Sequence, residues 1–221
     1  MSASVLVESV GVTRSFARVG DVLADVSLTV ERGSCVAIVG RSGCGKTTLL
    51  SLLGALDVPT RGQVLYDGTD FRAMSGVRRA RARRRIGVIF QQSPMIARLP
   101  LWENVTYPLV PRGTSADERR EIAVHWLERL GLADRIGARP EELSGGERRR
   151  VGVARALAGE PDLILADEPT SDLDSDNAEG VRRLFEEFRS AGGTLVLATH
   201  DPFRDAPDGE VVRMDAGRLL R

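Results

Sequence analysis

One glycine-rich stretch carries residues that together suit phosphate chemistry. It reads Gly40, Arg41, Ser42, Gly43, Cys44, Gly45, Lys46 and Thr47, which matches the pattern G-x-x-x-x-G-K-[ST]. Glycine lets backbone N–H groups approach phosphate oxygens, a lysine neutralises their charge, and a threonine hydroxyl is a ligand for Mg²⁺. Lys46 is also the only lysine in the sequence. The stretch predicts a phosphate-binding loop, with Thr48 as a further contact.

The residues on either side of this loop supply the context that the motif requires. Residues 35–39 form an apolar run typical of a strand buried on both faces, and residues 48–53 begin a helix. A helix N-terminus favours anions through its dipole and its free N–H groups. The plain alternative is a glycine turn before a helix, but strand, loop and helix in this order favour the phosphate loop.

Two acidic residues at the end of a second apolar run suit the same chemistry. Asp167 and Glu168 follow residues 163–166, which read as a buried strand. In a parallel sheet the carboxyl ends of the strands face the ligand crevice. We therefore expect Asp167 to orient Mg²⁺ or its water, and Glu168 to accept a proton from a water attacking the γ-phosphate. Two acids that merely end a strand in solvent are the alternative.

Composition limits the class of protein. The sequence has 221 residues, 42% of them hydrophobic and 28% charged, which allows one α/β domain with an inserted subdomain. The 31 acidic and 31 basic residues balance, so net charge predicts no nucleic-acid partner. The N-terminus lacks a leader pattern and no apolar run reaches membrane-spanning length. We expect a cytoplasmic protein.

The order of patterns along the chain predicts the architecture. Strands are expected at residues 5–12, 22–30, 62–68, 86–90, 162–167, 194–199, 210–214 and 218–220, and helical segments at residues 72–85, 102–109, 117–132, 144–159 and 175–191. The fold class is α/β, with a mainly parallel sheet, an N-terminal antiparallel β layer and an inserted α-helical subdomain. The expected division is a core of residues 1–91 and 160–221 with a helical subdomain of about residues 92–159.

The second half of the chain carries motifs of one known family. Residues 143–147 (Leu-Ser-Gly-Gly-Glu), with residues 150–157 after them, resemble the signature sequence of ATP-binding cassette (ABC) ATPases. The landmarks also follow in that family's order over nearly the whole chain: phosphate loop, Gln91, signature, Asp167 with Glu168, residues 171–174 and His200. The resemblance implies a P-loop NTPase core that binds ATP and Mg²⁺ and hydrolyses ATP.

The same resemblance implies roles for single residues. Phe16 is similar in position to an aromatic that stacks on adenine, although plain packing is the alternative. Gln91 resembles the glutamine that contacts Mg²⁺ and the attacking water, and His200 resembles a histidine that contacts the γ-phosphate. The alternatives without a functional role are an exposed glutamine for Gln91 and a structural histidine at a strand end for His200. Lys46, Gln91, Glu168 and His200 are thus the expected catalytic residues, and Thr47, Gln91 and Asp167 the expected metal ligands.

The signature motif implies a second chain. Ser144, Gly145 and Gly146 begin a helix and offer an anion site, which the family presents to the nucleotide of a partner in a head-to-tail homodimer. Asp174 resembles a residue that links the two sites. Two residues depart from the family pattern: Glu147 replaces a common glutamine, and Asp172 adds a negative charge near the interface, which could slow hydrolysis or weaken dimerisation.

Finer features resemble the cassettes of the lipoprotein-release and macrolide-efflux group. That resemblance implies a separate permease and a place at the inner face of the cell membrane, with residues 91–109 as the dock and Trp102 or Met95 as candidate contacts. The arginine-rich run of residues 78–85 is interpreted as a solvated face rather than a lipid or nucleic-acid site. A soluble P-loop ATPase or a small-molecule kinase remains the alternative function.

Overall fold

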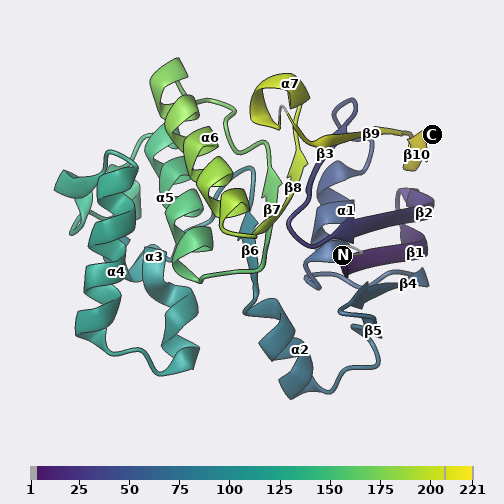
Figure 1. Cartoon of the computed structure of the whole chain (residues 1–221), viewed down its shortest axis with the longest axis horizontal. Coiled ribbons are helices and arrows are strands. Elements are labelled where there is room, and N and C mark those ends of the chain that lie inside the picture. Colours follow the sequence, from purple (N-terminus) through teal and green to yellow (C-terminus); the bar gives the residue numbers. More distant parts are fainter. Residues whose placement is uncertain (1–3, 207, 221) are drawn as a thin grey trace.

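The computed structural model describes residues 4–206 and 208–220, and its smaller sheet forms one end of the molecule (Figure 1). This sheet is antiparallel, with the strand order β2-β1-β4-β5. Its strands are β1 (Val5–Phe16), β2 (Gly20–Glu31), β4 (Arg61–Tyr66) and β5 (Thr69–Asp70). Asp67 and Gly68, between β4 and β5, both have positive φ, as a tight hairpin turn requires. The predicted antiparallel layer and hairpin are confirmed.

The central sheet has the strand order β10-β9-β3-β8-β7-β6. Its strands are β3 (Cys35–Val39), β6 (Ile86–Ile89), β7 (Leu163–Asp167), β8 (Thr194–Ala198), β9 (Glu210–Asp215) and β10 (Arg218–Leu220). All neighbours pair in parallel except β10 with β9. Every residue of β7 and β8 is buried, which explains their continuous apolar runs. The carboxyl ends of β3, β6, β7 and β8 meet at one edge, where the candidate residues follow them.

Helices surround the central sheet. They are α1 (Lys46–Leu53), α2 (Gly76–Arg83), α3 (Leu101–Thr106), α4 (Ala116–Arg129), α5 (Gly145–Ala158), α6 (Ser175–Ser190) and α7 (Pro202–Asp205), with 3₁₀ turns η1 (Tyr107–Arg112), η2 (Ala133–Arg135) and η3 (Pro140–Glu142). In Figure 1, α3, α4 and α5 stand together at the end opposite the antiparallel sheet. We call the part from α3 to α5 the helical region. None of the described helices has both the length and the apolar character needed to cross a membrane.

The buried apolar side chains form two clusters on opposite faces of the central sheet. One cluster joins that sheet to the antiparallel sheet and contains Leu49 and Leu53 of α1. The other contains Leu101, Leu127 and Val151 of the helical region together with side chains of β7, β8 and α6. The helical region therefore packs onto the sheet through a shared core, so its position and that of the strand ends depend on each other.

Several boundaries differ from the sequence-based prediction for local reasons. α1 begins at Lys46 instead of Thr48, because Gly45 adopts a left-handed conformation (φ 111°) and ends the loop there. The segment predicted as one helix from residue 102 to 109 changes to a 3₁₀ turn at Tyr107, and Pro108 and Pro111 lie inside that turn. The short helix α7 was not predicted.

Candidate functional site

The glycine-rich loop lies between β3 and α1, and its backbone is tightly packed. A Cβ on Gly40 would lie 2.2 Å from the carbonyl oxygen of Met214, and one on Gly45 would lie 2.8 Å from Leu23 Cδ2. Gly45 is also the N-cap of α1 and has no side chain to satisfy the first N–H groups of the helix. The loop therefore leaves a free helix N-terminus, the arrangement that binds phosphate.

Lys46 is buried and folds back across this loop. Its Nζ donates to the carbonyl oxygens of Gly40 at 2.8 Å and Arg41 at 3.2 Å. A buried ammonium needs such partners. An arriving phosphate would offer the lysine a charged partner instead, which makes stronger hydrogen bonds than a carbonyl oxygen.

Most of the predicted residues line one cleft of about 220 Å³ at the carboxyl edge of the sheet. The lining comprises Ser42, Gly43, Gly45, Lys46, Thr47, Thr48, Gln91, Asp167, Glu168 and His200, together with Val22 of β2. The sequence analysis missed Val22, because a valine in an alternating strand carries no signal of ligand contact. Gly40, Arg41 and Cys44 belong to the loop but do not line the cleft.

Thr47 and Asp167 provide oxygen atoms suited to a magnesium ion. Thr47 Oγ1 donates to Asp167 Oδ2 at 2.5 Å, and the Asp167 side chain is buried. Mg²⁺ takes few ligands from a protein and completes its octahedron with water and phosphate oxygens. The exposed Gln91, which follows β6, lines the same cleft. The donor set therefore fits Mg²⁺ bound with a nucleotide.

The carboxyl group of Glu168, beside these groups, has a raised pKa. Burial raises this pKa, electrostatic interactions with His200 and Lys46 lower it, and Asp167 and Asp205 act in the same direction as burial. His200 Nε2 lies 2.9 Å from Glu168 Oε1, but without hydrogen-bond geometry, so this buried oxygen has no hydrogen-bond partner within the described residues. An unpartnered carboxylate oxygen aimed into a polar cleft is suited to hold a water.

Asp205, which the sequence analysis did not single out, fastens the segment that carries His200. Its buried carboxylate accepts hydrogen bonds from Thr199 Oγ1 and from Thr170 Oγ1, the latter at 2.9 Å. Arg182 of α6 pairs with the same carboxylate at 3.2 Å. One side chain therefore ties together the ends of β7 and β8 and α6. No sequence pattern marks it, because two of its three partners, Thr170 and Arg182, are distant in the chain.

Besides Gly40, Arg41 and Cys44 of the loop, four predicted nucleotide contacts lie outside this cleft. Ser144, Gly145 and Gly146 begin α5, where Ser144 and Glu147 form the predicted capping box, and none of them lines the cleft. Phe16, at the end of β1, is 40% exposed, and the guanidinium of Arg14 covers its ring at 4.5 Å from the centroid. One chain therefore brings together the loop and the acids but not the signature residues.

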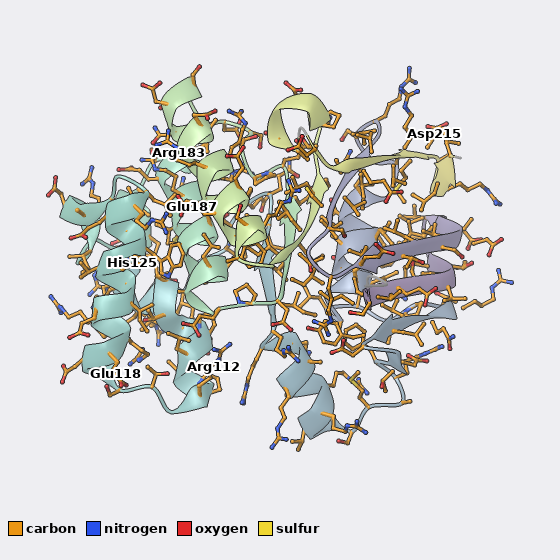
Figure 2. The ribbon with its side chains drawn as sticks, in the orientation of Figure 1. Arg112, Glu118, His125, Arg183, Glu187 and Asp215 are labelled. Atoms are coloured by element: carbon orange, nitrogen blue, oxygen red, sulfur yellow. The ribbon has the colours of Figure 1, made fainter. Side chains whose placement is uncertain are left out.

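The other histidine lies elsewhere. His125 of α4 stands at the outer edge of the helical region, as Figure 2 shows, and packs edge-on against Trp126.

A cavity larger than the cleft, about 450 Å³, is lined by apolar side chains such as Trp126, Leu157 and Phe188 and by Asp162 and Thr194 at the starts of β7 and β8. It therefore lies at the opposite edge of the sheet from the acids.

A glycine loop at a helix N-terminus, facing two acids at the end of one parallel strand, defines a P-loop nucleotide-binding protein. Residues 23–171 match the family described as ABC transporter, and the chain belongs to this family. It is an ATP-binding cassette, the ATP-hydrolysing part of such transporters. This confirms the family inferred from the signature motif and the fold class predicted from the order of strands and helices.

Individual relatives agree with this assignment. An uncharacterized ABC transporter ATP-binding protein of Thermotoga maritima is 44% identical over 200 residues, which are 90% of this chain and 86% of that protein. The macrolide export ATP-binding/permease protein MacB of a Shewanella species is 45% identical over 91% of this chain. The chain spans only 32% of that MacB and 34% of the one from Burkholderia thailandensis.

Among solved structures, the dimeric ATP-binding cassette MJ0796 in a post-hydrolysis state, bound to ADP and Pi, matches with a TM-score of 0.91 and 36% identity. The match covers 98% of this chain and 97% of that one. A likeness of this extent to a transporter cassette disfavours the alternative of an unrelated P-loop kinase.

Proposed function

We propose that this chain powers a separate membrane permease by closing onto a second copy of itself around ATP and opening again after hydrolysis. The observation that carries the proposal is the division of the phosphate-binding groups. The loop, Asp167 and Glu168 share one cleft, whereas Ser144 begins a helix outside it. The MJ0796 dimer and the MacB chains, named as joint ATP-binding and permease proteins, support the two partners.

Within one chain, the loop and the strand ends bind the triphosphate. Lys46 leaves its carbonyl partners to neutralise the β- and γ-phosphates, while the N–H groups of residues 43–47 hold their oxygens. Thr47, Asp167 and Gln91 would hold Mg²⁺, which supplies charge neutralisation when bound. Phe16 would stack on adenine once Arg14 moves aside, since the guanidinium occupies one face of the ring.

Glu168 accepts the proton of the attacking water in this scheme. The raised pKa of its carboxyl group, which results first from burial, makes it a stronger base than an exposed glutamate. His200 lies against the same carboxylate and would contact the γ-phosphate. Asp205 keeps the end of β8 in place, so that His200 stays at the cleft.

The partner chain supplies the remaining groups. The α5 N-terminus presents the Ser144 hydroxyl and the N–H groups of Gly145 and Gly146, which suit a γ-phosphate held by the other chain. Asp174 caps α6 through Asn177 and lies in the segment proposed to link the two sites. ATP thus holds the dimer together, and hydrolysis weakens it.

The permease is proposed to dock between the helical region and the core. A groove of about 300 Å³ there is lined mainly by apolar atoms and includes Leu56, Phe90, Tyr107 and Pro108. Trp102 and Met95, the contacts suggested from sequence, are partly buried against the helical core instead. Tyr107 is 51% exposed and is the better candidate. Docking there would hold the chain at the inner face of the membrane.

The domain division remains part of this proposal. A core of residues 1–91 and 160–221 with a helical subdomain of residues 92–159 is supported by the grouping of α3, α4 and α5 at one end (Figure 1).

The arginines of residues 78–85 stay a predicted solvated face without a specific nucleic-acid partner. Arg78, Arg81 and Arg83 are exposed on α2.

A complementation experiment tests the shared site. Lys46→Ala and Ser144→Ala are purified separately, mixed, and assayed for ATP turnover. In a head-to-tail dimer, the intact loop of the Ser144 variant meets the intact signature of the Lys46 variant, so the mixture regains one active site in each heterodimer. A mixture no more active than its two components would overturn the shared site.

A second experiment measures the dimer directly. Glu168→Gln keeps the side-chain volume but removes the base, so ATP should be bound and not turned over. In size-exclusion chromatography with light scattering, this variant is expected to have twice the monomer mass with ATP and Mg²⁺, and the monomer mass without them. Monomers at saturating ATP would contradict the proposal.

A further inference from the structure

The turn after β7 holds two residues in a strained backbone conformation. Glu168 has a φ of 49° and Asp172 a φ of 62°, which lie in a backbone region that residues other than glycine rarely adopt. The N–H of Glu168 donates to Ala198 on β8 at 2.9 Å, which fixes one side of the residue. Strained residues persist where the surrounding structure over-determines them. The other side of Glu168 must therefore be held as well.

Ser171 Oγ donates to the Glu168 carbonyl oxygen at 2.9 Å, and Arg149 of α5 provides a further hold on the same oxygen. Its NH1 group donates to the carbonyl oxygen of Glu168 at 2.6 Å, and its NH2 group donates to Asp172 Oδ2 at 3.1 Å. The Arg149 side chain is buried, whereas that of Asp172 is 78% exposed. The planar guanidinium thus contacts both strained residues from one rigid fork.

This contact also gives a structural partner to Asp172, the acid that departs from the family pattern. The sequence left Asp172 as an uncompensated negative charge near the proposed interface. In the structure Asp172 and Arg149 form an ion pair, so part of that charge is balanced within the chain. A buried guanidinium left without a partner is destabilising. The two residues are therefore expected to depend on each other.

We propose that Arg149 is a positioning residue for Glu168: it ties the signature helix α5 to the turn that aims this carboxylate into the cleft. Arg149 lies five residues after Ser144 on the same helix. A movement of α5 on engagement of its N-terminus would shift the guanidinium and, through the carbonyl, the peptide of Glu168. Small displacements of a catalytic group lower rates strongly. The inference rests on the role proposed for Glu168.

The test compares Arg149→Gln with Arg149→Lys, Asp172→Asn and the matched control Arg148→Gln. Arg148 is the neighbouring arginine on α5, and its guanidinium donates a hydrogen bond to the Pro140 carbonyl oxygen at 3.5 Å. Arg149→Gln is expected to lower kcat about tenfold or more and to leave the Kd for ATP within about twofold, because the loop is untouched. Arg149→Lys should restore part of kcat, and Arg148→Gln should leave it within twofold.

Asp172→Asn guards against a failure of the Arg149 variants to fold. It keeps a hydrogen-bond acceptor and removes the charge, so a lowered kcat without a change in the Kd for ATP supports the positioning role of Arg149 even if the Arg149 variants do not fold, and an unchanged kcat then contradicts it. Near-normal kcat in Arg149→Gln, or equal losses of kcat and ATP affinity, would overturn it. Glu168→Gln separates the positioning role of Arg149 from the catalytic role of Glu168. If that variant keeps ATP turnover, the proposed role of Glu168 as the base is wrong.

Discussion

The nucleotide cleft and the start of α5 both present groups that bind phosphate, but they are built differently. In the cleft, Lys46, Asp167 and Glu168 are buried. Asp167 and Glu168 contact groups distant in sequence, and Lys46 donates to carbonyl oxygens of its own loop. At the start of α5, Ser144 and Gly145 are exposed, and the hydrogen bonds of Ser144 stay within its own capping box. A buried site can be complete in one chain, whereas an exposed helix end is available to another molecule.

A second helix start makes this comparison sharper. Ser115 and Glu118 form the same capping box at α4, and Glu118 points away from the molecule at the end of the helical region (Figure 2). Both boxes follow the same local rule, in which a serine oxygen accepts from the N3 N–H and a glutamate accepts from the N-cap N–H. The capping geometry by itself therefore does not distinguish an ordinary cap from a proposed nucleotide contact.

The largest effect is expected for Lys46→Ala. The variant removes the charge that balances the β- and γ-phosphates, and loss of such a group lowers turnover by at least roughly a hundredfold. Steady-state phosphate release measures the effect, and circular dichroism checks that the fold is intact. Full turnover in this variant would show that the loop is not the site.

The next largest effect should distinguish the capping box of α5 from that of α4. Ser144→Ala and Ser115→Ala should each lower the free energy of unfolding by about 1 kcal/mol. Ser144→Ala alone should also lower ATP turnover, by roughly tenfold, while ATP binding to the monomer stays unchanged. Denaturant unfolding and phosphate release measure the two quantities. Equal turnover in both variants would remove the proposed distinction between the helix starts.

A pair of glycine variants tests the junction between the two regions. A Cβ on Gly152 of α5 would lie 2.5 Å from Ser93 Oγ, in the segment just after Gln91, whereas one on Gly180 of α6 would meet open space. Gly152→Ala should lower the free energy of unfolding by about 1–3 kcal/mol through overpacking. Gly180→Ala should raise it by roughly 0.5–1 kcal/mol, since alanine favours helix. Similar unfolding curves for both variants would contradict this packing.

The smallest effect concerns the pH dependence of stability. Because burial raises the pKa of Glu168 above its ordinary value, its contribution to stability is present below the ordinary value and is lost as pH rises through the folded value. Glu168→Gln should therefore be more stable than the natural chain at pH 8, and the difference should shrink towards pH 5. Thermal unfolding across this range measures it, and a difference that does not change with pH would argue against a raised pKa.

The turnover rate should also depend on the protonation of Glu168, but it should rise with pH, whereas the contribution of Glu168 to stability falls. A general base acts only when deprotonated, so kcat is expected to rise with pH through the raised pKa of Glu168. The pH profile of the natural chain supplies this measurement.

Much of this protein could be predicted from sequence because its signals are local. Apolar runs at residues 35–39 and 163–166 mark buried parallel strands, and the spacing of Gly40, Gly45, Lys46 and Thr47 marks a loop whose chemistry needs those side chains. The rule that parallel strands end at one edge then brings Asp167 and Glu168 to the loop. The capping box of Ser144 is likewise contained within four residues.

For other distant groups, the tertiary structure alone decided which of them meet. Arg149 contacts the Glu168 carbonyl across 19 positions, and Asp205 joins Thr170 and Arg182 across 35 and 23 positions. Arginine and aspartate occur throughout this sequence, mostly on its surface, so residue type gives no sign of such a contact. Only the packing of α5 and α6 against the sheet selects these partners, because burial requires every charged group to find one.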